Sequence, residues 1–311
     1  MLSQNKHSDV TYVLGIDGGG SKTIACLIHL VSQKRWQVVA GPSSLTNDFS
    51  GAVKVLKFLI DEVISQAKCK SNEISAVFGL AGASHSENVA KLNKMFCNDF
   101  AVFDLCNDAK ISAFGANNGK EVAVISLGTG SVGLRLQKNS KGELVDTIVG
   151  GWGFFIDDEG GGAKLGYHAM RALVAEYQHV GKIESKLGQA VAAFIHKKTY
   201  TLTRQNIAVW LSQAKPIDFA KLSPLVTKHQ NDCPVAKQII VNHVMSVESL
   251  ITDTLAKSNL PVILVGGLAH FTESILSEKS KGLLISAKGS ALDGACLLAN
   301  IQLNQFNQTI Q

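Results

Sequence analysis

The chain has 311 residues, which at about 150 residues per domain is typical of two domains rather than one. Hydrophobic residues make up 46% and charged residues 18% of the sequence, so it can bury real cores and does not have the composition of a disordered chain. The formal charge of +5 comes from scattered Lys and Arg residues without a dense basic stripe, which argues against nucleic-acid binding.

Two further features bear on the compartment. No apolar run reaches the roughly 18 residues that a membrane span requires, and residues 1–9 are polar, with no apolar signal segment before Tyr12. The six cysteines form no C-x-x-C pair and no zinc-like spacing, as expected of free thiols in a reducing compartment. We therefore expect a cytoplasmic protein that binds neither a membrane nor nucleic acid.

The first part of the chain alternates strands with helices. Short apolar runs predict strands at 11–16, 23–30, 35–40, 74–80 and 100–105, with a glycine-rich turn between the first two. Apolar residues at helical spacing predict a helix at 51–67, and shorter helices are expected at 87–96 and 108–114.

The pattern then starts again. Strands are predicted at 122–127, 132–137, 144–149 and 261–265, helices near 163–178, 183–196, 203–213 and 232–257, and a last helix at 289–301. Residues 13–21 and 124–131 thus each form a strand and a glycine turn that opens a similar series of elements. This repetition indicates a duplicated α/β unit with a ligand cleft between its halves.

Neither glycine turn fits the two commonest phosphate-binding motifs. Gly128, Gly130 and Gly133 match G-x-G-x-x-G, but a strand is predicted after them, whereas a dinucleotide-binding fold requires a helix. The glycines at 15 and 20 approach a P-loop, but the lysine comes one position late and a strand again follows. What remains is a hairpin whose backbone N–H groups can approach phosphate oxygens; a plain tight turn explains the same residues.

Two aspartates stand at predicted strand ends. Asp17, beside the first glycine turn, is suited to hold Mg²⁺ through water. Asp108 follows Asn107 at the carboxyl end of a strand, where open α/β sheets place ligands, and phosphoryl transfer from ATP needs a base near the acceptor hydroxyl. An N-cap role for Asp108 is also physically sound, and the two roles are compatible.

A glycine-rich loop at 150–162 combines a tryptophan with acids. Carboxylates accept paired hydrogen bonds from sugar hydroxyls, and the face of Trp152 can pack on a sugar ring. A solvated acidic loop is the alternative, and the alternating acids of a Ca²⁺ loop are missing. Gly266 and Gly267 follow an apolar strand, where they allow an adenosine to lie against the backbone or simply form a turn.

Seven short motifs together resemble the N-acetylglucosamine kinase branch of the BadF/BadG/BcrA/BcrD ATPase family. They are residues 15–21, 79–82, 107–109, 127–131, 150–153, 158–160 and 265–267, and they follow one another in the family's order. The resemblance implies an α/β fold of two ribonuclease H-like (actin-like ATPase) domains with a central cleft. The expected domains are 1–116, joined by the C-terminal helix at 296–311, and 117–295. We also expect a homodimer.

The resemblance implies ATP, Mg²⁺ and an amino sugar as ligands. By analogy, Asp108 is the base that deprotonates the 6-hydroxyl of the sugar. The expected sugar ligands are Asn47, Asn107, Gly151, Trp152 and Asp158. The expected nucleotide ligands are Gly18, Gly19, Gly20, Ser21, Lys22, Thr23, Gly128, Thr129, Gly130, Ser131, Gly266, Gly267 and Leu268.

One departure from the family pattern leaves the substrate open. Asp157 stands where the family usually has glycine, and a second carboxylate beside the sugar would favour a cationic amino sugar. Glucosamine is therefore a rival to N-acetylglucosamine, unless Asp157 points to solvent. A more distant alternative is the ATPase that activates 2-hydroxyacyl-CoA dehydratases, but the paired, glycine-flanked cysteines of its iron–sulfur cluster are missing. A sugar-sensing regulator would need a DNA-binding domain, and none precedes residue 11.

Overall fold

The computed structural model describes residues 10–83, 86–195 and 202–310. The polar segment 1–9 and His196, the last residue of an expected helix, lie outside these ranges. The chain forms two compact units: unit 1 comprises Met1–Val122, Leu136–Asp146 and Ala287–Gln311, and unit 2 comprises Ala123–Arg135 and Thr147–Ser286. The domain boundaries expected from the sequence stay a prediction. Among the described helices, none combines the length and apolar character that a membrane crossing requires.

Unit 1 is built on a five-stranded sheet in the order β3-β2-β1-β4-β5. Its strands are β1 (Tyr12–Gly18), β2 (Thr23–His29), β3 (Arg35–Ala40), β4 (Ile74–Leu80) and β5 (Val102–Asn107). β1 is antiparallel to β2 and parallel to β4, which is parallel to β5. In this register Gly18, Leu80 and Asn107 are neighbours, so the carboxyl ends of the three parallel strands meet at one edge.

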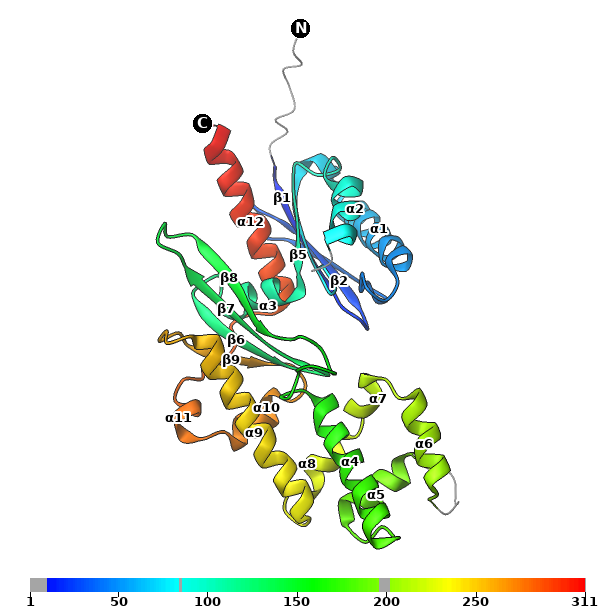
Figure 1. Ribbon diagram of the computed structural model, residues 1–311. Coiled ribbons are helices and arrows are strands. Elements are labelled where there is room, and N and C mark those ends of the chain that lie inside the picture. The colour runs from blue at the N-terminus through cyan, green and yellow to red at the C-terminus, as the bar shows by residue number, and fades with distance from the viewer. Residues whose placement is uncertain (1–9, 84–85, 196–201, 311) are drawn as a thin grey trace. The chain divides into compact units, whose positions relative to one another are not determined.

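Helices cover both faces of this sheet (Figure 1). On one face lie α1 (Phe49–Ala67) and α2 (Ser86–Phe96), whose leucines pack with Leu14, Ile16, Ala25 and Leu27. Because side chains alternate along a strand, the residues between these face the other side, where α12 (Ala291–Ile310) packs on β1 and on α3 (Asp108–Ala116). A 3₁₀ turn, η1 (Ser71–Glu73), precedes β4.

The second sheet has the order β8-β7-β6-β9. Its strands are β6 (Val122–Leu127), β7 (Ser131–Lys138), β8 (Leu144–Gly150) and β9 (Val262–Val265). β9 is parallel to β6, so the glycine turn after β6 and the glycines after β9 leave the sheet at the same edge. The two sheets with their helices give the predicted α/β fold class.

Outside this sheet, the described part of unit 2 is mainly helical. Its helices are α4 (Gly162–Val180), α5 (Lys186–Ile195), α6 (Arg204–Gln213), α7 (Pro216–Ala220), α8 (Ser223–His229), α9 (Pro234–Leu255), α10 (Ala269–Ile275) and α11 (Glu278–Lys281). α9 serves two cores: Ile239 and Ile240 pack among the helices, whereas Val247 and Ile251 pack against β6 and β9. Helices α7, α8, α10 and α11 were not predicted, because two turns or fewer show no helical periodicity.

Candidate active site

The carboxyl ends of β1, β4 and β5 gather the candidate catalytic residues of unit 1. Asp17 is the penultimate residue of β1, and Asn107 ends β5. Asp108 is the first residue of α3, directly after Asn107. Because the three strands are parallel and in register, both acids belong to one edge of the sheet, where open α/β folds bind ligands.

Asn107, rather than Asp108, caps α3. Its side-chain oxygen accepts a hydrogen bond from Lys110 N at 2.7 Å, so the N-cap role considered for Asp108 is filled by its neighbour. Asp108 accepts a bond from Ala109 N at 3.0 Å and has further acceptor capacity. The amide oxygen of Asn107 is thus occupied by the helix.

Asp17 is half-buried and Asp108 is more exposed, and the negative charges of the two acids repel each other. Partial loss of surrounding water raises the pKa of Asp108, although the hydrogen bond from Ala109 N lowers it in part. Burial raises the pKa of Asp17, and the negative charge of Asp108 raises it further, while Lys22 opposes the shift. A cation or a hydroxyl donor would relieve this repulsion.

The residues present fit a magnesium ion held mainly by water and phosphate. Asp17 offers carboxylate oxygens, the ligand type that Mg²⁺ prefers. Within the described ranges, no three His, Cys, Asp or Glu side chains are grouped to hold a metal. Such an ion would therefore keep most of its ligands from solvent and substrate.

Fewer residues of the first glycine turn are available to a ligand than the sequence indicated. Gly18 and Thr23 are buried and paired within the β1–β2 hairpin, and the Thr23 hydroxyl donates to Gly41 O at 2.7 Å and lies 2.8 Å from Ser43 Oγ. The tip is closed by a bond from Gly19 N to Lys22 O at 3.0 Å. Gly20, Ser21 and Lys22 are exposed, so they are the residues free to meet a phosphate.

Asn47 lies in the loop before α1. Leu45 N donates to Ala81 O at 2.9 Å, which fastens this loop just after β4, between the ends of β1 and β5. Asn47 itself is exposed. Among the described residues, no hydrogen bond joins its side chain to Asp17 or Asp108, although all three belong to the same sheet edge.

In unit 2, the second glycine turn is held by the start of α4. Gly128 N donates to Gly130 O at 3.0 Å, while Gly162 N and Ala163 N donate to the carbonyls of Gly128 and Thr129 at 2.9 Å. The Ser131 hydroxyl accepts a bond from Gly160 N at 3.1 Å. The turn and the acidic loop before α4 are therefore one connected structure.

The acids of that loop lie against the turn. A Cβ on Gly130 would be 2.3 Å from Asp158 Oδ2, so a side chain there would displace the Asp158 carboxylate. Asp158 adopts φ 68°, a left-handed conformation that is costly for a non-glycine residue and is often found at functional sites. Burial raises the pKa of Asp158, and the charge of Asp157 raises it further.

Trp152 and Asp157 belong to the same loop in unit 2. Asp157 Oδ2 accepts a bond from Trp152 N at 3.4 Å, so the Asp157 carboxylate turns back toward the loop and is only half-buried. The Trp152 side chain is 79% exposed, which leaves its face free. Gly151 is exposed beside it.

The glycines after β9 border the second turn. Gly266 has φ 99°, and a Cβ there would be 2.5 Å from Leu127 O. Leu268 N donates to the same carbonyl at 3.0 Å. Residues 266–268 thus lie directly beside the end of β6, where Gly128 begins the turn.

An ion pair between a buried lysine and an exposed glutamate near this site was not predicted from the sequence. Lys164, on α4 and 8% exposed, donates to Glu159 Oε1 at 2.5 Å, and His168 lies 3.4 Å from Glu159 Oε2. Burial raises the pKa of Glu159, but its bonds to Lys164 and His168 outweigh this and lower it. The positions 159, 164 and 168 follow no single helical spacing, because Glu159 precedes the helix, so no simple signal marks the cluster.

The fold and these turns together define a class. Two units, each with a glycine turn between its first two strands and ligand-type residues at strand ends, form the two-domain actin-like ATPase fold. More specifically, the chain matches the BadF/BadG/BcrA/BcrD ATPase family over residues 14–299 and belongs to that family.

Relatives in this family match nearly the whole chain. It is 28% identical to the N-acetylmuramic acid/N-acetylglucosamine kinase of Clostridium acetobutylicum, with 93% of this chain and 98% of that protein covered. It is 24% identical to glucosamine kinase GspK of Vibrio cholerae, with 93% and 96% covered. A Chromobacterium violaceum structure, provisionally assigned as an N-acetylglucosamine kinase, superposes with a TM-score of 0.80 at 26% identity, covering 93% of this chain and 99% of that one.

Proposed function

We propose that the chain is an ATP-dependent hexosamine kinase that phosphorylates the 6-hydroxyl of N-acetylglucosamine. The observation that carries the proposal is Asp108: a carboxylate with a raised pKa at the ligand-binding edge of the sheet, with its helix capped by Asn107 instead. The relatives named as N-acetylglucosamine and glucosamine kinases support the substrate class.

In this proposal Asp108 accepts the proton of the 6-hydroxyl as that oxygen attacks the γ-phosphorus of ATP; the bond from the γ-phosphorus to the bridging oxygen breaks, and ADP leaves. A raised pKa makes the carboxylate a stronger base. Asn47, Gly151, Trp152 and Asp158, with the amide nitrogen of Asn107, bind and orient the sugar. Positioning of this kind is the main task in phosphoryl transfer.

The nucleotide is bound by backbone groups. The exposed residues Gly20, Ser21 and Lys22 and the turn 128–131 contact the phosphates, and residues 266–268 contact the adenosine. Mg²⁺, held by Asp17 through water, neutralises phosphate charge when bound. A homodimer and a cytoplasmic location stay predictions.

An ADP-release assay tests the reaction directly. We expect ADP with N-acetylglucosamine well above the rates with glucose, N-acetylmannosamine or buffer alone. Asp108→Asn should lower kcat by about 10²-fold or more, since a positioned base contributes about 10²–10⁴. The sugar should still bind, as shown by calorimetry. Near-normal turnover in Asp108→Asn would overturn the assignment of the base, and sugar-independent ADP release would overturn the kinase.

Glucosamine is the second candidate, and the adjacent acids Asp157 and Asp158 favour it. Asp157 raises the pKa of Asp158, and an ammonium group would relieve this repulsion. If Asp157 selects the cationic sugar, Asp157→Asn should lower kcat/KM for glucosamine relative to N-acetylglucosamine while keeping an oxygen for Trp152 N. Asp157→Gly should do the same. An unchanged ratio in both variants would show that Asp157 does not set specificity.

A further inference from the structure

Two buried cysteines from distant parts of the chain meet on the α12 face of the unit 1 sheet. Cys26 lies on β2 and is paired across the strands with Gly15 of β1. Cys296 lies on α12, and a Cβ on Gly15 would be 2.6 Å from Cys296 N and 2.7 Å from Cys296 Sγ. The sulfur of Cys296 therefore occupies the space that a side chain at position 15 would fill.

This arrangement places the two thiols side by side. Opposed residues of an antiparallel pair carry their side chains on the same face, with Cβ atoms about 4.5–5.5 Å apart. The Cys26 side chain thus projects next to the place that Cys296 Sγ occupies, and the Cys296 thiol lies 3.6 Å from Cys26 O. Disulfides need Cβ atoms about 3.5–4.5 Å apart, so bond formation requires the backbones of α12 and β2 to bring the two Cβ atoms to that separation and the two sulfurs to rotate toward each other.

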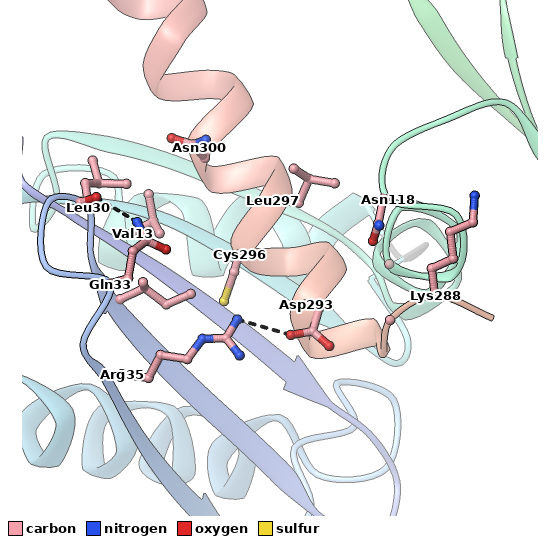
Figure 2. Close-up of a pocket in the computed structure, with 13 residues that line it drawn as sticks. Val13, Leu30, Gln33, Arg35, Asn118, Lys288, Asp293, Cys296, Leu297 and Asn300 are labelled. Carbon is pink, nitrogen blue, oxygen red and sulfur yellow. Dashed lines mark hydrogen bonds and ion pairs between the residues drawn. The ribbon is translucent and has the colours of Figure 1, made fainter.

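The two cysteines are buried, but a cavity adjoins Cys296. Cys26 is 3% and Cys296 5% exposed, and Cys296 forms part of the wall of a cavity of about 450 Å³. Figure 2 shows the Cys296 sulfur directed from α12 toward the Arg35 guanidinium, which pairs with Asp293 at 3.2 Å. The cavity gives a molecule as small as a peroxide a route to the Cys296 sulfur. Cys26 is not in the cavity wall, so the peroxide must pass beside the Cys296 sulfur to reach Cys26.

The surroundings of Cys26 and Cys296 give the two thiols different pKa values. The hydrogen bond with the Cys296 thiol, together with the positive charge of Arg35, lowers the pKa of Cys26 to about 7. Burial and the negative charge of Asp293 act in the other direction and raise it. The pKa of Cys296 is correspondingly raised, by the same bond and by burial. By contrast, burial and nearby carboxylates raise the pKa of Cys106 to about 12. Cys26 is thus the nucleophilic thiolate and Cys296 the neighbouring thiol.

We propose that Cys26 and Cys296 form an oxidisable dithiol that hydrogen peroxide converts into a disulfide between β2 and α12. The Cys26 thiolate attacks peroxide: an S–O bond forms, the O–O bond breaks, and hydroxide leaves. The Cys296 sulfur then attacks Cys26: the S–S bond forms, the S–O bond breaks, and the displaced hydroxide takes the Cys296 proton as water. In sum, two thiols are oxidised to a disulfide and one peroxide is reduced to two waters.

Peptide mapping of the full-length protein tests this proposal without reference to kinase activity. Protein carrying Cys97→Ala, which removes an exposed thiol, is treated with dilute hydrogen peroxide and digested without reductant. We expect a cross-linked peptide that joins Cys26 to Cys296, and a loss of two thiols under denaturing conditions. Dithiothreitol should restore both. An intact thiol count, or cross-links elsewhere, would overturn the proposal.

Thermal unfolding gives a second readout. A bond between residues 26 and 296 closes a very long loop, which constrains the unfolded chain, so oxidation should raise Tm by several degrees in a way that dithiothreitol reverses. In Cys26→Ala and in Cys296→Ala the reversible rise should disappear, whereas Cys106→Ala, at another poorly exposed thiol, should keep it. A rise that persists in Cys26→Ala would also contradict the proposal. Should either variant fold poorly, the peptide map of the parent protein decides.

Discussion

Asp17 and Asp108 are acids at one sheet edge, and the roles proposed for them make opposite demands on the surrounding protein. A base should have a raised pKa, and partial loss of the surrounding water raises the pKa of Asp108. A metal ligand should stay ionised, yet burial and Asp108 both raise the pKa of Asp17. The pair is therefore electrostatically strained until a cation or substrate reaches the site.

The coupling of these two acids predicts the acidic limb of the pH–rate profile. Asp108 must be ionised to accept a proton, so kcat/KM should fall as pH drops through its raised pKa. Charge repulsion between two carboxylates is mutual, so Asp17→Asn, which removes a negative neighbour, should lower the pKa of Asp108 and move the limb of the residual activity to lower pH.

The control for this prediction is Asp61→Asn, at an exposed acid on α1 remote from the strand ends, which should leave the limb unchanged. The measurement is kcat/KM for the sugar between pH 4 and 8. A limb that stays in place in Asp17→Asn would show that the two acids titrate independently.

At the scale of elements, the β1–β2 hairpin separates glycines that shape the fold from one that is free for a ligand. A Cβ on Gly18 would lie 2.2 Å from Ser43 Oγ and 2.5 Å from Leu80 Cδ2, whereas a Cβ on Gly20 would meet nothing within 4 Å. The two positions are two residues apart in the sequence but differ completely in their surroundings.

Alanine substitutions at these glycines should therefore have distinct effects. Gly18→Ala should lower the free energy of unfolding by about 1–3 kcal/mol through overpacking. Gly20→Ala should change stability by less than about 0.5 kcal/mol but raise KM for ATP, because its methyl group keeps phosphate away from the tip. Urea unfolding and ATP titration separate the two. Equal loss of stability in both variants would contradict an open tip.

The same hairpin illustrates how far sequence patterns lead. Apolar runs were enough to place the strands and to reject a P-loop, because a strand follows each turn. The pattern did not show that Gly18 and Thr23 lie inside the hairpin, since that depends on Ser43, Gly41 and Leu80 from other segments. Likewise, which of Asn107 and Asp108 caps α3 depends on a one-residue helix boundary that propensities do not resolve.

At the scale of the molecule, the chain's last helix joins the unit formed by its first residues. α12 packs on β1, β4 and α3, and Ser75 Oγ donates to Ala299 O at 2.7 Å. Apolar spacing predicted this helix only as far as Ile301, because its polar Gln and Asn residues mask the periodicity, whereas the family resemblance placed a helix at 296–311; the helix ends at Ile310. Unit 1 is therefore complete only when the whole chain is present.

A substitution at Gly294 tests the packing of α12 on unit 1, because two physical effects predict changes in stability of opposite sign there. In an isolated helix, glycine to alanine is stabilising by about 1 kcal/mol. In unit 1, a Cβ on Gly294 would be 1.8 Å from Ile111 O and 2.5 Å from Gly115 N, so α12 would have to move away from the backbone of α3. Since backbone atoms cannot yield as a side chain can, we expect the steric effect to prevail and Gly294→Ala to lower Tm by several degrees. Asn304→Ala, at an exposed position of the same helix, should leave Tm unchanged or raise it slightly. A higher Tm in Gly294→Ala would mean that α12 does not pack against α3 as closely as described.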